Sequence, residues 1–140
     1  MSKLLIMKII ISFLSIFTCA FCFGQSDWSY IGSSVNKMDY YIKDIRKTYK
    51  DDVYSIWLKI EYPEKKVKNK KGQWTTVAGN HTISSSNINC TEKETKLDRV
   101  IKYSNKGIVL KDQTMYSEWE RIIPESMAEA VFNFVCGEPE

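Results

Sequence analysis

Apolar and polar side chains alternate most regularly over residues 53–62. Every second residue from Tyr54 to Tyr62 is a tyrosine, an isoleucine or a leucine. In an extended chain these side chains share one face, and the residues between them share the other. The pattern therefore predicts a β-strand over 53–62 whose tyrosine, isoleucine and leucine face is turned to the core. Pro63 ends this strand, and Trp57 lies on its outer face.

Shorter apolar runs predict further strands over 28–31, 40–42, 45–49, 74–77, 83–90, 96–103 and 108–110. Asp44 is expected to form a turn between two of them. Residues 83–90 are rich in serine and asparagine, which predicts an edge strand that leads to Cys90. The last two runs form a hairpin, because Gly107 can adopt the positive φ that its turn requires.

The C-terminal segment changes to a helical period. Apolar residues recur at spacings of three and four along residues 124–135, which predicts an amphipathic helix. Pro124 suits the first helical position and Gly137 the C-terminal end. The apolar arc consists of Met127, Ala130, Val131, Phe134 and Val135. The predicted fold class is α+β: a single antiparallel β-sheet of about six strands with a C-terminal α-helix packed on it.

The N-terminal segment has the pattern of a signal peptide. Two lysines precede an uncharged apolar run over residues 9–23, and Gly24 follows. We predict a signal peptide over 1–24, with cleavage before Gln25, and cleavage after Ala20 as the second choice. The apolar run is shorter than the roughly 20 residues that an uncleaved anchor needs. Lipidation at Cys19 or Cys22 is the other alternative, although neither follows the residues that acylation requires.

Removal of 24 residues and two lysines from the 140-residue chain leaves 116 residues, 18 of them basic and 17 acidic. This balance argues against a nucleic-acid partner, and no transmembrane span is expected after signal cleavage. The predicted mature domain, residues 25–140, retains only Cys90 and Cys136, and an even pair in an exported domain predicts one disulfide. The bridge would staple the end of the helix to the sheet. Structural zinc needs four ligands, so we predict no metal and no cofactor.

The chain offers few groups for catalysis. His81 is the only histidine and follows the turn-like pair Gly79–Asn80, where a surface position is expected. Glu118 and Glu120 flank Trp119 and could form an acid–base couple, although solvated surface charge is the favoured interpretation. We assign no catalytic residue and predict that the protein is not an enzyme.

A cluster of lysines is the strongest candidate for binding. Residues 64–72 contain five lysines and the single acid Glu64, which predicts a solvated hairpin loop or connection. Five ammonium groups on a projecting loop could engage sulfated glycans, anionic lipid or acidic protein surfaces. An aromatic side chain beside the cations is common at protein-binding surfaces. The candidate binding residues are Lys65, Lys66, Lys68, Lys70, Lys71 and Trp74.

The order of several motifs from Trp28 to Gly137 resembles the bacterial surface-adhesin protein E family. These motifs are residues 28–32, Tyr40–Tyr41, residues 53–57, a lysine-rich break, Cys90, residues 99–103, Gly107, Trp119, Ile123–Pro124 and residues 134–136. The resemblance implies an antiparallel sheet, a C-terminal helix and a disulfide that joins them. It also implies an outer-membrane adhesin that binds host matrix or serum proteins and can form a homodimer.

The sequence therefore predicts an exported, non-enzymatic binding domain that resembles surface adhesin E. Its location is the periplasm, the outer surface or the secreted fraction. The alternative is a periplasmic structural or envelope-maintenance protein without a host ligand. A weaker third interpretation is an enzyme that uses Glu118 and Glu120.

Overall fold

A computed structural model describes residues 27–137 of the chain. The predicted signal peptide, residues 1–24, lies outside the described residues and stays a prediction. The elements are β1 (Ser29–Ser33), β2 (Asp39–Lys47), β3 (Val53–Glu61), β4 (Lys65–Lys68), β5 (Trp74–Val77), β6 (His81–Asn89), β7 (Glu94–Tyr103), β8 (Val109–Thr114), β9 (Glu120–Arg121) and α2 (Met127–Cys136).

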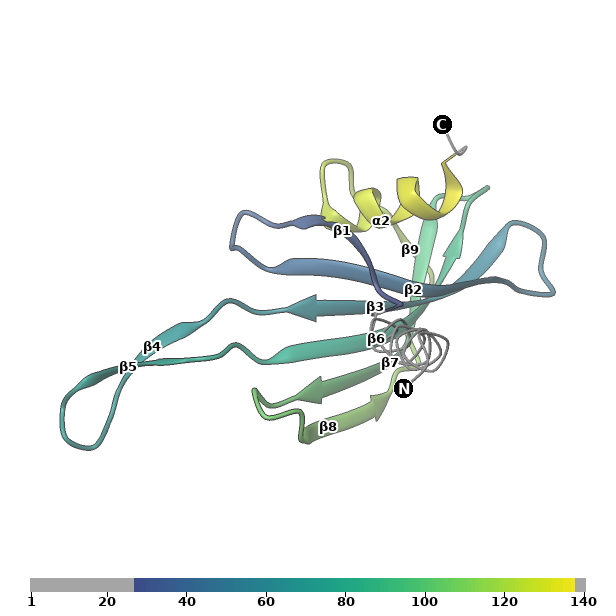
Figure 1. The fold of residues 1–140 in the computed structure, drawn as a ribbon. Coiled ribbons are helices and arrows are strands. Elements are labelled where there is room, and N and C mark those ends of the chain that lie inside the picture. Colours follow the sequence, from purple (N-terminus) through teal and green to yellow (C-terminus); the bar gives the residue numbers. More distant parts are fainter. Residues whose placement is uncertain (1–26, 138–140) are drawn as a thin grey trace, which may run out of the picture.

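The main sheet is antiparallel and curled, with strand order β1-β2-β3-β6-β7-β8 and a short pairing of β9 with β7. Helix α2 lies across one end of this sheet, next to β1 (Figure 1). Strands β4 and β5 form a separate two-stranded sheet that extends away from the other end. The predicted α+β class with about six strands and a packed C-terminal helix is confirmed, and the two-stranded extension is an addition to it.

The core lies between the sheet and the helix. Ile42 of β2, Ile56 of β3, Ile88 of β6 and Val131 of α2 are buried together, and Leu58 packs against them. Each fully buried aliphatic side chain of this kind contributes about 1.5–3 kcal/mol relative to an exposed one. The predicted inner face of the strand over 53–62 therefore does supply the core, through its central residues.

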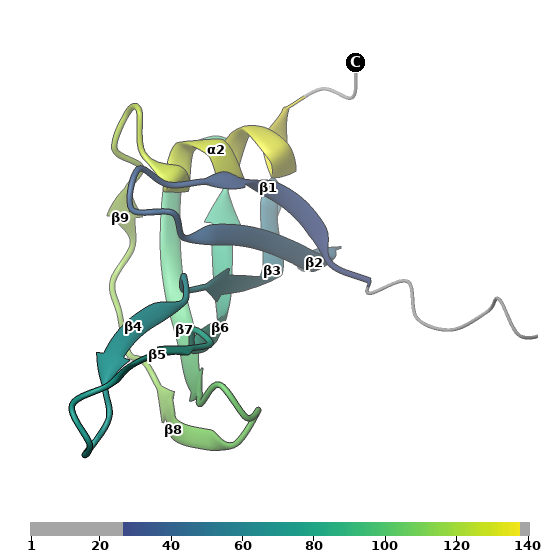
Figure 2. The same cartoon turned by 60° about the vertical axis from the view of Figure 1, so that its left-hand side comes forward.

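Strand β6 is a central strand, so the prediction of an edge strand over 83–90 is wrong. It pairs with β3 on one side and with β7 on the other. Thr82, Ser84 and Ser86 are buried on the same face as Ile88. Figure 2 shows β6 between β3 and β7 in the curled sheet. The polar composition of β6 therefore does not mark the edge of the sheet.

The predicted turn at Asp44 is also wrong, because β2 continues through it as one strand. Asp44 has a φ of 53°, and the pairing of β2 with β3 shifts register between Lys43 and Arg46. These are the features of a β-bulge, in which an extra residue bends the strand without ending it. Aspartate tolerates the left-handed conformation better than most residues do, which explains the turn-like signal.

Helix α2 begins at Met127 and not at Pro124 as predicted. The Ser126 side chain accepts a hydrogen bond from the backbone N–H of Glu129, which makes Ser126 the N-cap. Glu125 has a φ of 61°, so the backbone before the cap is not helical. The predicted C-terminal end is confirmed, because the N–H of Gly137 donates to the carbonyl of Asn133 at 2.9 Å.

The buried face of α2 is rotated from the predicted arc. Phe134 is 47% exposed, whereas Phe132, Val135 and Cys136 pack against the core. Phe132 and Cys136 are four residues apart and therefore lie on the same side of the helix. The side that carries Cys136 must face the sheet to form the disulfide, and Phe132 is turned inward with it.

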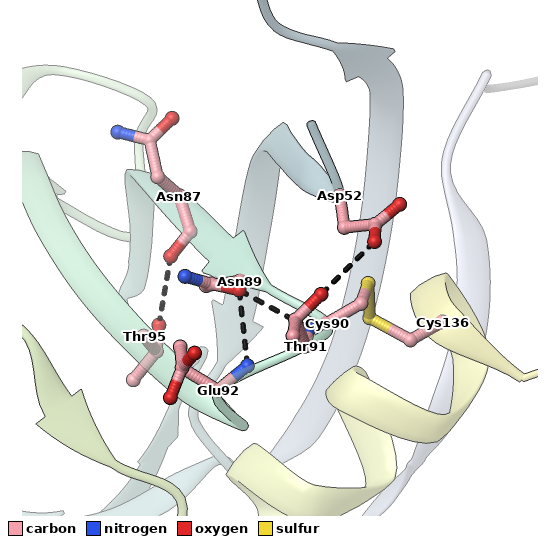
Figure 3. The surroundings of a disulfide bond; sticks show 8 residues. All are labelled: Asp52, Asn87, Asn89, Cys90, Thr91, Glu92, Thr95 and Cys136. Carbon is pink, nitrogen blue, oxygen red and sulfur yellow. Dashed lines mark hydrogen bonds between the residues drawn. A yellow bond between two sulfur atoms is a disulfide. The ribbon is translucent and has the colours of Figure 1, made fainter. Parts of the chain in front are cut away.

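The predicted disulfide between Cys90 and Cys136 is confirmed and joins the end of α2 to the sheet (Figure 3). The two Cα atoms are 5.6 Å apart. Cys90 is held by its neighbours, since its N–H donates to the carbonyl of Asp52 at 2.8 Å. The Thr91 hydroxyl donates to the Asp52 carboxylate at 2.9 Å, and Asn89 Oδ1 accepts from the N–H of Thr91 at 3.1 Å. The half of the bridge on the sheet is therefore positioned independently of the helix.

The hairpin of β7 and β8 is confirmed, and Gly107 has the expected positive φ, 75°. Arg99 on β7 and Asp112 on β8 form a bidentate ion pair across the hairpin. Arg99 Nε and Nη2 donate to the two carboxylate oxygens at 2.9 and 2.6 Å. These hydrogen bonds hold the pKa of Asp112 below its ordinary value, because they stabilise the carboxylate.

We expect loss of the disulfide to lower the melting temperature strongly. The bridge spans a sequence separation of 46 residues, and the chain-entropy model gives about 4 kcal/mol for a loop of that size. The measurement is thermal unfolding of the wild type with and without reductant, beside the double variant Cys90→Ser, Cys136→Ser. The double variant should have the melting temperature of the reduced wild type, and reductant should not change it. Equal melting temperatures for all samples would contradict the role of the bridge.

We expect Asp112 to titrate below an ordinary aspartate, and Arg99→Gln to raise its pKa back to the usual range. Because the folded pKa is lower than the unfolded one, the ion pair stabilises the fold above the unfolded pKa. Its contribution is lost as the pH falls through the folded pKa. A carboxyl NMR titration of both proteins measures this. If the titration midpoint of Asp112 is the same in both proteins, the ion pair does not form in solution.

Candidate functional site

The lysine-rich segment is half strand and half turn. Strand β4 pairs with β5 from Lys65↔Val77 to Lys68↔Trp74. Between the strands, Asn69 Oδ1 accepts hydrogen bonds from two backbone N–H groups of the turn, and Gly72 has a φ of 79°. The prediction of a hairpin is confirmed in form, but the segment is more ordered than a solvated loop. We call residues 65–77 the basic hairpin.

The base of the basic hairpin is fixed against the main sheet. The N–H of Tyr62 donates to the carbonyl of Asn80 at 3.0 Å, so the two connecting segments lie side by side. A Cβ atom on Gly79 would lie 1.7 Å from the carbonyl oxygen of Tyr62 and 2.9 Å from that of Pro63. Only glycine permits this approach, which sets the direction in which the hairpin leaves the sheet.

The two faces of the basic hairpin differ in character. Strand alternation places Lys66 and Lys68 on the same face as Trp74. Lys68 Nζ lies 5.6 Å from the centroid of the Trp74 ring, and Trp74 is 67% exposed. Lys65 and Val67 lie on the opposite face, where they line a cavity together with residues of the main sheet.

All six predicted binding residues therefore belong to one projecting element. Lys70 and Lys71 lie in its turn, and the five lysines are exposed. None of the ion pairs found within residues 27–137 involves a lysine of the basic hairpin. Its positive charge is thus carried by ammonium groups that are open to an external anion.

A second cation–aromatic cluster escaped the sequence analysis. Lys59 Nζ lies 4.4 Å from the centroid of the Tyr41 ring and 5.3 Å from that of Trp28. Lys43 Nζ lies 5.0 Å from the same Trp28 ring, and Lys59 also pairs with Glu61 at 2.7 Å. The one feature of the sequence that pointed to this cluster is Lys59 on the outer face of the strand over 53–62. These cations already have partners, so they are less available to a ligand than the hairpin lysines.

The groups considered for catalysis do not assemble into a site. His81 begins β6, where it is half-buried and stacks on Tyr103 with ring centroids 4.6 Å apart, so it lies in a strand and not in a turn. Glu120 lies in β9 and Glu118 just before it, and both are exposed. Within residues 27–137, no three histidine, cysteine, aspartate or glutamate side chains gather to form a metal site.

The linked sheet and helix define a small disulfide-bonded α+β protein of the kind suited to an oxidising compartment. The chain belongs to the surface-adhesin protein E family, whose model matches residues 28–137. Comparison with curated proteins and with solved structures gave no match. Family membership indicates a non-enzymatic binding protein with a surface-adhesin-like role at an exported or surface location. In the stretch from residue 27 to residue 137, no helix is long and apolar enough to span a membrane.

We expect Gly79→Ala to destabilise the fold by about 1–3 kcal/mol, because the added methyl group overlaps backbone atoms that must move. The amide signals of Tyr62 and Asn80 should also shift. Urea unfolding and amide NMR spectra measure both effects. Gly72→Asn is the matched control, since a Cβ at Gly72 meets nothing within 4 Å and asparagine tolerates positive φ. Wild-type stability and unmoved amides in Gly79→Ala would contradict the close approach.

Proposed function

We propose that the protein is an exported, non-enzymatic binding domain that uses the basic hairpin to bind anionic macromolecules of a host or its matrix. In this proposal residues 1–24 direct export and are removed, and the mature chain begins at Gln25. The observation that carries the proposal is the projection of five exposed lysines and Trp74 beyond the main sheet. Sulfated glycans are the ligand class that fits this element best.

Electrostatics favours a polyanion over a neutral ligand. Single exposed ion pairs are worth little, but several ammonium groups on one element act together on a ligand with repeated charges. Ions in solution screen such contacts over a Debye length of about 8 Å at physiological ionic strength. Binding should therefore weaken steeply as salt is added.

Trp74 adds a contact that does not depend on charge. Its ring is exposed on the same face as Lys66 and Lys68, and a sugar ring or an apolar side chain could cover it. Aromatic side chains are enriched where proteins bind their partners. The hairpin thus combines long-range attraction with a short-range contact.

We expect replacement of the five hairpin lysines by glutamine to weaken binding to immobilised heparin by at least about fivefold, if each contributes a few tenths of a kcal/mol. The slope of affinity against salt concentration should fall as well. A control with the same change in charge replaces five exposed lysines elsewhere, namely Lys37, Lys47, Lys50, Lys106 and Lys111. Surface plasmon resonance on all three proteins measures both quantities. Equal losses in the two variants would point to net charge alone and contradict a role for the hairpin.

Location decides between adhesion and an internal role. Protease treatment of intact cells, followed by mass spectrometry, should release peptides of the mature chain if the domain faces the outside. Full protection until the outer membrane is opened would favour the periplasmic structural alternative. Homodimer formation, which the family resemblance implies, remains a prediction that light scattering of the mature protein would test.

A further inference from the structure

A cavity of about 360 Å³ lies where the basic hairpin meets the main sheet. Its size falls within the range of about 300–1,000 Å³ that is usual for small-molecule sites. Lys65, Val67 and Val77 line it from the hairpin, and Lys102 and Leu110 line it from β7 and β8. The connection between β5 and β6, the first residues of β6, Tyr62 and Tyr103 complete the lining.

The lining joins exposed apolar groups to cations. Leu110 is 61% exposed, Val67 41% and Tyr62 36%, so three exposed large apolar side chains share one cavity. Lys65 and Lys102 are the charged lining residues, and no aspartate or glutamate lines the cavity. A ligand with an apolar surface and a negative charge would cover the exposed apolar side chains and neutralise the two lysines.

Several contacts hold the cavity in shape without a ligand. The hydrogen bond between Tyr62 and Asn80, together with the close approach of Gly79, fixes the side next to the hairpin. His81 and Tyr103 stack with an angle of 8° between their rings and form part of the opposite side. A preformed site of this kind loses little conformational entropy when a ligand binds.

We propose that this cavity binds one sugar unit that carries a sulfate or carboxylate group. A sugar ring presents C–H groups on its face and hydroxyl groups at its edge. The aliphatic and tyrosine side chains match the face, whereas Asn80 and His81 offer hydrogen-bonding groups for the edge. Lys65 and Lys102 match the anionic substituent.

This proposal rests on the proposed function. The sugar unit in the cavity at the base of the hairpin belongs to the same anionic glycan that the hairpin lysines bind. Charge attraction along the hairpin discriminates little between polyanions, since it depends mainly on charge density. A shaped cavity with a defined set of hydrogen-bonding groups does discriminate. It would therefore supply the specificity of the domain, while the outer lysines supply the attraction.

The test is an amide NMR titration of the mature protein with a sulfated heparin disaccharide, which is too short to extend along the whole hairpin. We expect saturable shifts at Asn80, His81 and Thr82. Lys102→Gln should weaken the affinity about two- to fivefold, the range for loss of one exposed ion pair, and Leu110→Glu should abolish the shifts. Lys106→Gln, in the turn after β7, is the matched control and should bind like the wild type. Both cavity positions are exposed, and the spectrum of each free variant verifies its fold.

Three further ligands and one further variant separate the possible outcomes. The desulfated disaccharide should bind much more weakly, and inorganic sulfate and hexanoate should give no comparable shifts. Absence of disaccharide shifts at the cavity, or equal binding of hexanoate, would overturn the proposal.

The variant with Lys66, Lys68, Lys70 and Lys71 replaced by glutamine tests the hairpin separately. If it loses heparin while the disaccharide fails to reach the cavity, the proposed function stands and this inference falls. If it keeps heparin while the disaccharide binds the cavity, the hairpin proposal falls and the cavity site stands.

Discussion

The unbroken pairing of β3 with β6 is the interaction on which the rest of the structure depends. The two strands pair from Val53↔Asn89 to Glu61↔His81 without a shift in register. The chain segment that connects them therefore leaves and re-enters the sheet at the same end, and this segment forms the basic hairpin. At the other end the same pairing places Cys90 beside Asp52, where the bridge to the helix begins. A slip by one residue would turn every side chain of a strand to the wrong face.

Stability and binding are placed at opposite ends of this strand pair. The buried isoleucines, helix α2 and the disulfide lie at one end, and the basic hairpin lies at the other (Figure 1). Five like charges near the core would weaken it by mutual repulsion and by the cost of desolvation. On an extension they remain hydrated and reach outward. The separation also allows the hairpin sequence to vary with little effect on the core.

Several features could be predicted because they depend on local pattern. Alternation over 53–62, the turn at Gly107 and the end of the helix at Gly137 all have a cause within a few residues. The exposure of the hairpin lysines, such as Lys68, was also predictable, because a dense run of like charge must be solvated wherever the chain places it. The cavity at the base of the hairpin was not predictable, because its lining comes from five strands and the segments that join them.

The sequence by itself determined the antiparallel α+β class, the amphipathic C-terminal helix, the cysteine pair and the basic character of one projecting segment. These follow from periodicity, composition and count, which do not depend on distant parts of the chain. Tertiary structure decided the central place of β6, the inward turn of Phe132 and the pairing of Trp28 with Lys59. A serine-rich strand can lie at an edge or in the middle of a sheet. Only the neighbours that pack against it settle which of the two environments it occupies.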